Sequence, residues 1–270
     1  KEKLLASYPD TKKVSILDLL DSKDEVIKEF GEYVYDKVFV HYTAKQWNIP
    51  IEQVDTSVIN RVPVILGYDD RYFQDKYQFM PKNGYNEIFE NMLSHKNIDI
   101  ELQKDAKDLL EIKNNKIYVD GLEYKGEVIY SGALDELLSY QYGALPYRSL
   151  NLEFTDYKEN YYQPSSVVNY PNDEKFTRIT EFKYLSNQIV KDNTTILREY
   201  PLTYDYKNSK HIPYYAILND ENKKLYEKYY SLVKDIKNFH LCGRLAEYKY
   251  YNMDAVIKRA LELYREIKGE

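Results

Sequence analysis

Three arginines in strand-like segments are the side chains of this chain best suited to hold an anion. Arg148 and Arg178 each lie within a short apolar run, and Arg198 stands next to Glu199. A guanidinium buried by a sheet needs a carboxylate or an anionic ligand, because an unpaired buried charge is very costly. Two interpretations therefore stay open: an anion-binding site, or a structural Arg–Glu pair between adjacent strands.

A second candidate site lies near the C-terminus, where an apolar run ends in a glycine. The run Phe239–Cys242 is followed by Gly243 and Arg244, then by a tyrosine-rich segment and an amphipathic pattern that begins at Met253. This order predicts a strand, a tight turn and a helix N-terminus. Such an arrangement directs backbone N–H groups at an anionic or electron-rich ligand.

Aromatic residues are a third source of candidates. Trp47 is the only tryptophan, and tyrosine accounts for 31 of the 270 residues. Flat hydroxylated rings suit sugars, nucleobases and diphosphates, but a lone tryptophan is also a common core anchor. A compositional bias toward tyrosine explains most of these rings equally well. The charged segments 61–64 and 69–78, on either side of Gly67, are either a loop that closes over a ligand or a solvated loop.

Composition narrows the classes of function. The net charge is −6, from 38 basic and 44 acidic residues, which argues against nucleic acid as the main partner. The four histidines are scattered without metal-ligand spacing, so we expect no metal site. Neither a G-x-G-x-x-G motif nor a P-loop occurs, and no apolar run reaches membrane-spanning length. The single cysteine, Cys242, excludes an intramolecular disulfide and fits a reducing cytoplasm.

The elements that must position these residues change in type along the chain. The first sixty residues predict helices, with a capping box at Ser22–Glu25. Residues 109–131 predict short strands joined by Asn-Asn and Asp-Gly turns. Four antiparallel strands are expected at 150–154, 167–170, 177–182 and 195–200, and helices at 222–236 and 253–267. The fold class is therefore α+β, with a helical front, an antiparallel middle and a strand–helix close.

Taken in order, these segments resemble the UDP-galactopyranose mutase family, from Tyr42–Trp47 to the C-terminus. The resemblance implies a helical domain, a twisted antiparallel sheet and a dinucleotide-binding α/β domain, the last present here as a remnant. It divides the chain into a partial helical domain at 1–60, a mobile loop and remnant strands of the FAD-binding domain at 61–135, an antiparallel substrate domain at 136–218, and the C-terminal strand–helix of the FAD-binding domain at 219–270.

The activity implied by this resemblance is the interconversion of UDP-galactopyranose and UDP-galactofuranose with FAD as cofactor, in an enzyme that commonly forms homodimers. Reduced flavin attacks the anomeric carbon through N5 while UDP departs, and the sugar then opens, recloses and recaptures UDP. Arginines and tyrosine hydroxyls would hold the diphosphate near the sugar throughout.

Individual residues acquire roles only through the resemblance. It implies catalytic roles, including contacts to the diphosphate, for Arg61, Arg178 and Glu199. It implies substrate-binding roles for Tyr42, Thr43, Trp47, Tyr72, Arg148, Asn169, Tyr215 and Tyr250. It implies cofactor-binding roles for Gly243, Arg244, Asn252 and Met253.

The chain departs from the family pattern in several places. Ile65 stands where many members carry a second loop arginine, Asn252 where aspartate is frequent, and His41 where glycine is common. Family members also begin with a glycine-rich βαβ unit that holds the FAD pyrophosphate and contains the active-site histidine. The sequence predicts that roughly one small domain of this kind is missing, so we expect a truncated form that does not fully bind FAD and is inactive by itself.

Two other functions stay open from the sequence. The chain could act as a non-catalytic UDP-sugar-binding fragment, since arginines and tyrosines suffice for binding without a competent flavin. It could instead belong to a different FAD-dependent oxidoreductase, such as an amine-oxidase-like enzyme. The diphosphate arginines argue against this last hypothesis.

Overall fold

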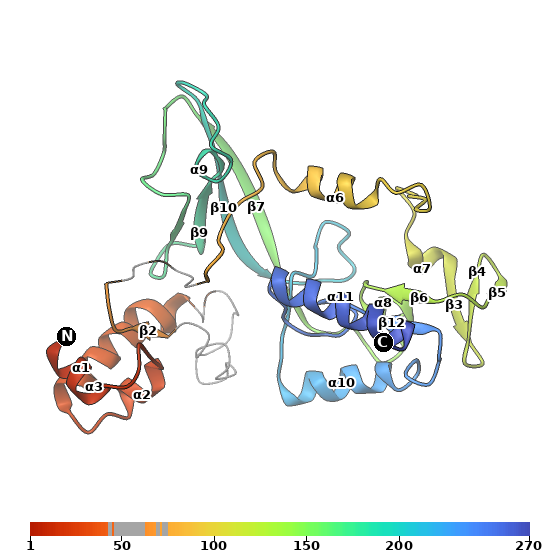
Figure 1. Ribbon diagram of the computed structural model, residues 1–270, viewed down its shortest axis with the longest axis horizontal. Coiled ribbons are helices and arrows are strands. Elements are labelled where there is room, and N and C mark those ends of the chain that lie inside the picture. The colour runs from red at the N-terminus through yellow and green to blue at the C-terminus, as the bar shows by residue number, and fades with distance from the viewer. Residues whose placement is uncertain (43–44, 46–62, 69–70, 72–74) are drawn as a thin grey trace. The chain divides into compact units, whose positions relative to one another are not determined.

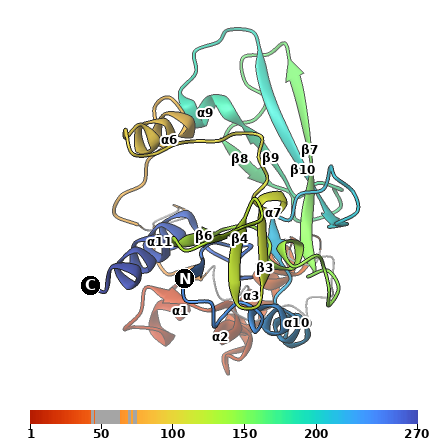
Figure 2. The ribbon, with the colours of Figure 1, turned by 90° about the vertical axis from the view of Figure 1, so that its right-hand side faces the viewer.

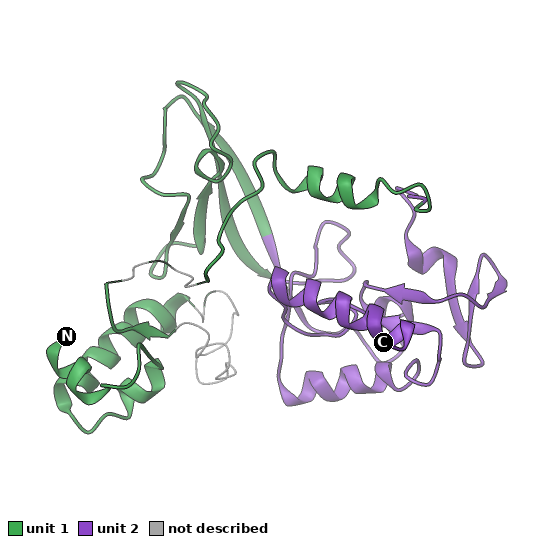
Figure 3. Cartoon of the chain, viewed as in Figure 1, with its two compact units in different colours: residues 1–98, 151–202 green, residues 99–150, 203–270 purple. Residues whose placement is uncertain are grey.

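The computed structural model describes residues 1–42, 45, 63–68, 71 and 75–270. The chain forms two compact units (Figure 3). Unit 1 comprises Lys1–Ile98 and Asn151–Leu202, and unit 2 comprises Asp99–Leu150 and Thr203–Glu270. Residues 46–60 of the predicted helical front lie outside the described residues. The division into four domains stays a prediction.

Unit 1 begins with a small helical bundle. Its elements are α1 (Glu2–Ser7), α2 (Ile16–Leu20), α3 (Glu25–Val34) and a π-helical turn η1 (Tyr35–Val40). Ser15 caps α2 by accepting from Leu17 N–H. Helix α3 is capped by the Asp24 side chain, not by Ser22 as the capping-box pattern predicted.

Close packing between α2 and α3 depends on a glycine. A Cβ placed on Gly31 would lie 2.9 Å from Leu19 Cβ, so any larger residue would push the helices apart. The core of this bundle consists of Val14, Ile16, Leu19, Ile27 and Phe39. A two-stranded ribbon completes it, in which β1 (Lys13–Val14) pairs antiparallel with β2 (Val64–Ile65). The predicted helix after the Asn83–Gly84 turn is present as α6 (Tyr85–Leu93).

A five-stranded sheet carries five of the candidate site residues (Figures 1 and 2). Its order is β11–β7–β10–β9–β8, and β7 and β10 contribute residues to both units. The strands are β7 (Tyr147–Tyr157), β8 (Val167–Asn169), β9 (Arg178–Glu181), β10 (Thr194–Thr203) and β11 (Tyr215–Ala216). The four predicted antiparallel strands are therefore present. Strand β9 ends one residue early, because Phe182 begins the short helix α9 (Phe182–Ser186).

Unit 2 contains a three-stranded meander whose turns are set by local backbone chemistry. It follows the short helix α7 (Ala106–Leu109) and consists of β3 (Leu110–Lys113), β4 (Lys116–Val119) and β5 (Leu122–Tyr124). Asn114, Asn115, Asp120 and Gly121 all have positive φ, as the predicted turns require.

The rest of unit 2 combines a parallel strand pair with helices. Strand β6 (Val128–Tyr130) pairs in parallel with β12 (Phe239–Leu241). The helices are α8 (Leu134–Leu137), α10 (Asp220–Tyr230) and α11 (Met253–Lys268). Helix α10 ends at Tyr230, earlier than the predicted Ile236, whereas α11 stops at Gly269 as predicted, with φ 73°.

The core of unit 2 contains a cluster that includes Leu134, Tyr147, Tyr229, Phe239 and Tyr248. The protein is thus a mixed helix-and-sheet molecule with an antiparallel sheet, which confirms the predicted α+β class. Within the described ranges, no helix has the length and hydropathy needed to cross a membrane.

Candidate functional site

Three candidate side chains stand side by side on adjacent strands of unit 1. Arg178 on β9 is the register partner of Asn169 on β8 and of Glu199 on β10. Residues directly opposite each other in antiparallel strands project from the same face, with their Cβ atoms about 5 Å apart. The register therefore aligns an amide, a guanidinium and a carboxylate. We call Asn169, Arg178 and Glu199 the strand row.

Arg178 connects the strand row to the helical segment. Its Nη2 donates to the Tyr42 hydroxyl at 2.9 Å, and its Nε lies 3.3 Å from Glu199 Oε2. The Glu199 side chain is only 13% exposed. Burial raises the pKa of Glu199 above its ordinary value, and the neighbouring Arg178 partly opposes that rise. The guanidinium and amide of the row, with the neighbouring Tyr42 hydroxyl, suit an anionic oxygen-rich ligand, and the Glu199 carboxylate pairs with the guanidinium.

Four predicted site residues lie outside the described part of the chain. These are Thr43, Trp47, Arg61 and Tyr72. Whether they join Arg178 around one cavity therefore stays a prediction.

Unit 2 holds a second group of predicted residues, which we call the ring cluster: Arg148, Tyr215, Arg244 and Tyr250. Arg148 on β7 is the register partner of Tyr215 on β11. The Arg148 side chain is buried, and its Nη1 donates to Thr203 Oγ1 at 2.9 Å. Burial lowers the pKa of Arg148 from its ordinary value.

Arg244 is held by rings and by backbone. Its guanidinium carbon lies 4.5 Å from the centroid of the Tyr250 ring and 6.0 Å from that of Tyr215. These two rings stack with centroids 6.2 Å apart and planes inclined by 21°. Arg244 Nε also donates to the Tyr251 carbonyl at 2.7 Å. Planar guanidinium stacking of this kind fixes the orientation of the charged group.

The predicted cofactor residues lie where two parallel strands end. Strands β6 and β12 terminate at Tyr130 and Leu241, and ligands of α/β folds bind at the carboxyl ends of parallel strands. Gly243 follows with φ 113°, and a Cβ built there would meet only Ser131 Cβ, at 3.8 Å. The backbone at Gly243 is therefore open to close approach by a flat group, which fits a flavin ring.

One expectation for this segment needs correction. The Gly243 N–H donates to Glu247 Oε2 at 3.0 Å, and the helix begins only at Met253, with Asn252 as its N-cap residue. A tight turn at 244–248 separates the glycine from the helix. The favourable dipole end of α11 therefore lies at Asn252 and Met253, not at Gly243 and Arg244.

Sequence reasoning missed three residues that support these groups. Lys45 donates to three backbone carbonyl oxygens of the loop between β8 and β9. Thr203 accepts from Arg148, and Glu247 bonds both the Gly243 N–H and Arg259 Nε. Lys45 lies inside the Tyr42–Trp47 segment and could have been singled out, whereas nothing in the local pattern marks Thr203.

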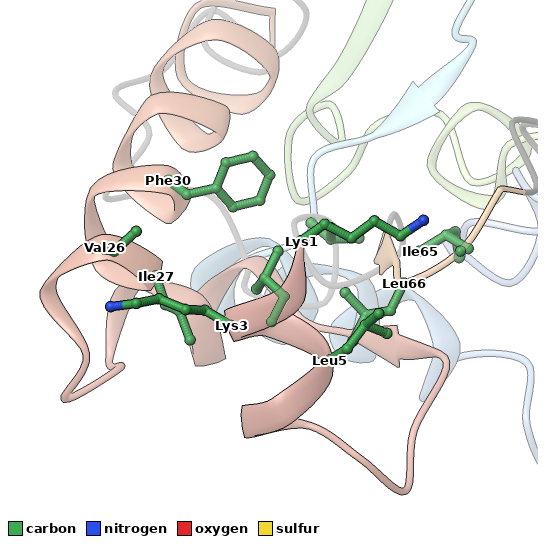
Figure 4. A pocket seen from close by; sticks show the side chains of 11 residues that line it. Lys1, Lys3, Leu5, Val26, Ile27, Phe30, Ile65 and Leu66 are labelled. Carbon is green, nitrogen blue, oxygen red and sulfur yellow. The ribbon is translucent and has the colours of Figure 1, made fainter.

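An apolar cavity in unit 1 lies apart from the strand row (Figure 4). It has a volume of about 340 Å³ and is lined by side chains from α1, α3 and the β2 region, including Phe30, Ile65 and Leu66. Ile65, which replaces a loop arginine of the family, thus contributes to an apolar wall. The residues of the strand row do not line this cavity. No group of three potential metal ligands occurs among the described residues.

Comparison with known proteins identifies the family of this chain. The profile of the UDP-galactopyranose mutase family, GLF, matches residues 37–250. The chain is 34% identical to an Escherichia coli dTDP-fucopyranose mutase over 264 residues, covering 96% of this chain and 66% of that protein. It is 36% identical to a probable UDP-galactopyranose mutase of Klebsiella pneumoniae over 249 residues, covering 92% of this chain and 61% of that protein.

A UDP-galactopyranose mutase of Mycoplasma pneumoniae is 32% identical over 257 residues, covering 94% of this chain and 64% of that protein. The chain thus spans slightly less than two thirds of the length of these relatives. A solved putative protoporphyrinogen oxidase from Exiguobacterium sp. 255-15 shares 10% identity, covers 58% of this chain and 45% of its own, and has a TM-score of 0.38, too distant to inform the fold. The family profile and the curated relatives together show that the chain belongs to the UDP-galactopyranose mutase family.

Proposed function

We propose that the protein is a UDP-galactopyranose mutase, an isomerase that interconverts UDP-galactopyranose and UDP-galactofuranose. Family membership supports a mutase that acts on a nucleotide sugar. The observation that carries the proposal is the strand row, in which Arg178 stands between Asn169 and Glu199 and contacts Tyr42. Location in the cytoplasm and assembly into homodimers stay predictions.

In this proposal the strand row binds the diphosphate of the substrate. Arg178 supplies the positive charge, and Glu199 orients the guanidinium through the contact at Nε. Tyr42 OH already lies 2.9 Å from Arg178 Nη2, so it can reach the same phosphate oxygens. Diphosphate held in this way stays close to the sugar after their bond breaks, which makes its return an intramolecular step. The arginine also stabilises the charge that develops on the leaving group.

The ring cluster is assigned to the sugar and the cofactor. Arg148 and Tyr215 project from the same face of the sheet, and the Arg244 guanidinium lies near the rings of both Tyr215 and Tyr250. Such rings form flat walls for a hexose and exclude water from it. The predicted contributions of Thr43, Trp47, Arg61 and Tyr72 belong to the same proposal.

FAD fits the backbone at Gly243, with Arg244, Asn252 and Met253 as its further contacts. When bound and reduced, it would supply the nucleophile for the anomeric carbon of the sugar. The residues of this chain keep that region open: Gly243 lacks a Cβ, and Glu247 holds the turn by accepting from its N–H. The first turn of α11 would direct N–H groups at the electron-rich edge of the flavin.

A second candidate substrate deserves the same assay, because one relative at 34% identity is a dTDP-fucopyranose mutase. The test incubates the protein, expressed from its whole gene and reduced with dithionite, with UDP-galactose and with dTDP-fucose in parallel. Chromatography of the nucleotide sugars should show a furanose product from UDP-galactose. Product from dTDP-fucose alone would favour the second candidate. Absence of product from both, in protein shown to contain flavin, would contradict a mutase.

Residues 1–270 by themselves form the second arm of this assay. Flavin absorbance reports whether they bind FAD, and a UDP titration reports whether they bind nucleotide. Binding of UDP without flavin and without turnover would match the hypothesis of a non-catalytic UDP-sugar-binding fragment. Amine oxidation with no effect on UDP-galactose would instead favour a different FAD-dependent oxidoreductase.

A further inference from the structure

Lys45 makes an unusual set of contacts for a lysine in a polar segment. Its ammonium nitrogen donates to the carbonyl oxygens of Tyr170 at 2.7 Å, Glu174 at 2.6 Å and Phe176 at 3.3 Å. An ammonium group has three hydrogens, and here each hydrogen has an acceptor. Partial burial lowers the pKa of Lys45, although the nearby Asp173 and Glu174 oppose that effect.

The carbonyl groups that Lys45 binds belong to the loop that joins two strands of the strand row. This loop, residues 170–177, begins directly after Asn169 and ends directly before Arg178. Tyr170 N–H donates to the Thr177 carbonyl at 2.8 Å, which closes the loop at its base. The Tyr170 and Phe176 rings pack edge to face with centroids 4.8 Å apart. The position of the loop therefore sets where Asn169 and Arg178 stand.

The same helical segment touches Arg178 through a second residue. Tyr42 OH accepts from Arg178 Nη2, and Lys45 follows Tyr42 by three positions in the sequence. The Tyr42 hydroxyl thus contacts Arg178 itself, and the Lys45 ammonium contacts the 170–177 loop beside it. A surface lysine with ordinary solvation would not account for three carbonyl contacts at one nitrogen, because each long side chain loses rotamer entropy when it is held.

We propose that Lys45 is a positioning residue that fastens the 170–177 loop to the helical segment and so holds Arg178 and Tyr42 in place for a nucleoside diphosphate. The proposal rests on the proposed function for the identity of the ligand alone. The loop contact itself is independent of any activity. Loss of the ammonium group should therefore loosen the loop and weaken binding of the diphosphate.

The test compares Lys45→Met with Lys183→Met. Lys183 is a matched control, because its buried ammonium also donates to two backbone carbonyls, those of Asn160 and Val190, in the same unit. It lies past the other end of β9 from Arg178. Hydrogen exchange of the amides in 168–178 reports on the loop, and calorimetric titration with UDP reports on the ligand. For active protein, KM and kcat for UDP-galactopyranose are measured as well.

For Lys45→Met we expect amide exchange in 168–178 to rise about tenfold and UDP affinity to fall about tenfold, in line with loss of a charge-assisted contact. KM should rise, and kcat should fall as well, because the arginine that Lys45 helps to position also stabilises the charge that develops on the leaving group. Lys183→Met should leave exchange in 168–178 and UDP affinity unchanged, even where its melting temperature falls.

Unchanged exchange in 168–178 of Lys45→Met would overturn the proposal. So would equal losses of UDP affinity in the two variants, because the effect would then be general destabilisation. Failure of the wild-type protein to bind UDP would contradict the proposed function instead, and the exchange measurement would still decide the role of Lys45.

Discussion

Two largely buried carboxyl groups, Glu199 in unit 1 and Asp135 in unit 2, have different surroundings. In unit 1 the carboxylate and the cation share one place, because Glu199 and Arg178 are register partners at 3.3 Å. In unit 2 the buried Asp135 accepts from the Leu145 N–H at 2.8 Å, and Arg244 rests against two tyrosine rings. Burial raises the pKa of both carboxyl groups, and that of Asp135 is about 6.

The neighbours of each charged group determine how its burial affects stability. An arginine beside Glu199 moderates the cost of burying the carboxylate, and the pair stays a local source of positive and negative charge for a ligand. For Asp135, desolvation raises the pKa most, and backbone hydrogen bonds, first that of the Leu145 N–H, oppose the rise only in part. The ring of Tyr250 and the carbonyl of Tyr251 set the orientation of the Arg244 guanidinium. What Arg244 adds to stability therefore depends on the planar shape of that group.

The largest expected effect concerns Asp135. Its pKa is about 6 in the folded protein, against 3.8 as the ordinary value, so the folded state keeps the proton at a pH where the unfolded chain has released it. The contribution of Asp135 to the free energy of unfolding is therefore fully present below pH 3.8, and it is lost as the pH rises through 6. The shift corresponds to roughly 3 kcal/mol at 1.36 kcal/mol for each pH unit.

Asp135→Asn removes this titration and keeps an acceptor for the Leu145 N–H. From pH 4 to pH 7, the free energy of unfolding of the variant should rise relative to wild type by roughly 2.5 kcal/mol, measured by urea unfolding. Asp235→Asn, at an exposed position, is the matched control and should show no such trend. A constant difference between Asp135→Asn and wild type over this range would refute the account of Asp135.

Removal of the cation in unit 1 should have the next largest effect. Arg178→Met leaves Glu199 buried without the guanidinium and breaks the bond to Tyr42. We expect a loss of about 2 kcal/mol in the free energy of unfolding at pH 7, below the range for fully buried pairs because Arg178 is 30% exposed. Urea unfolding measures it. A loss below about 0.5 kcal/mol would show that the pair behaves like a surface ion pair.

Arg244 provides the corresponding test in unit 2. Arg244→Met should lower the free energy of unfolding by about 1 kcal/mol, because it loses the contact with the Tyr250 ring and the hydrogen bond to the Tyr251 carbonyl. Arg244→Lys keeps the charge but not the planar group, so it should recover less than half of that loss. Thermal unfolding of both variants measures how much stability each one loses. Full recovery by lysine would mean that charge, not stacking, holds this residue.

The smallest expected effect is the pH dependence that Glu199 introduces. Burial raises its pKa, so Glu199 contributes stability that is present below the ordinary pKa of 4.5 and lost as the pH rises through the folded value. Glu199→Gln should reduce the dependence of the free energy of unfolding on pH in this range. In Arg178→Met the pKa of Glu199 should rise further, because the arginine no longer opposes the effect of burial. Carboxyl NMR titration of wild type and Arg178→Met measures this shift, and an unchanged pKa would contradict the comparison.

Local signals in the sequence predicted the turns and stops well. The Asn114–Asn115 and Asp120–Gly121 turns and the Gly269 helix end all require positive φ, which these residue types adopt at low cost. The strand segments were also predictable, since their alternation is local. These features depend on a few neighbouring residues, so no knowledge of the tertiary structure was needed.

Non-local features escaped prediction for a physical reason. Apolar residues at helical spacing predicted α3, yet its buried positions are Ile27 and Gly31, while Val26 and Phe30 remain 52% and 39% exposed. The glycine decides which face α2 can approach, and the spacing of apolar residues does not reveal it. The roles of Arg178 and Glu199 came from family resemblance. Their pairing depends on strand register, which single strands do not specify.

The most direct test of the central claim is a crystal structure of the protein with UDP bound. We predict a diphosphate oxygen within hydrogen-bond distance of an Arg178 guanidinium nitrogen, with the Tyr42 hydroxyl beside it. UDP bound elsewhere, with no phosphate oxygen near Arg178, would contradict the assignment of the strand row as the diphosphate site.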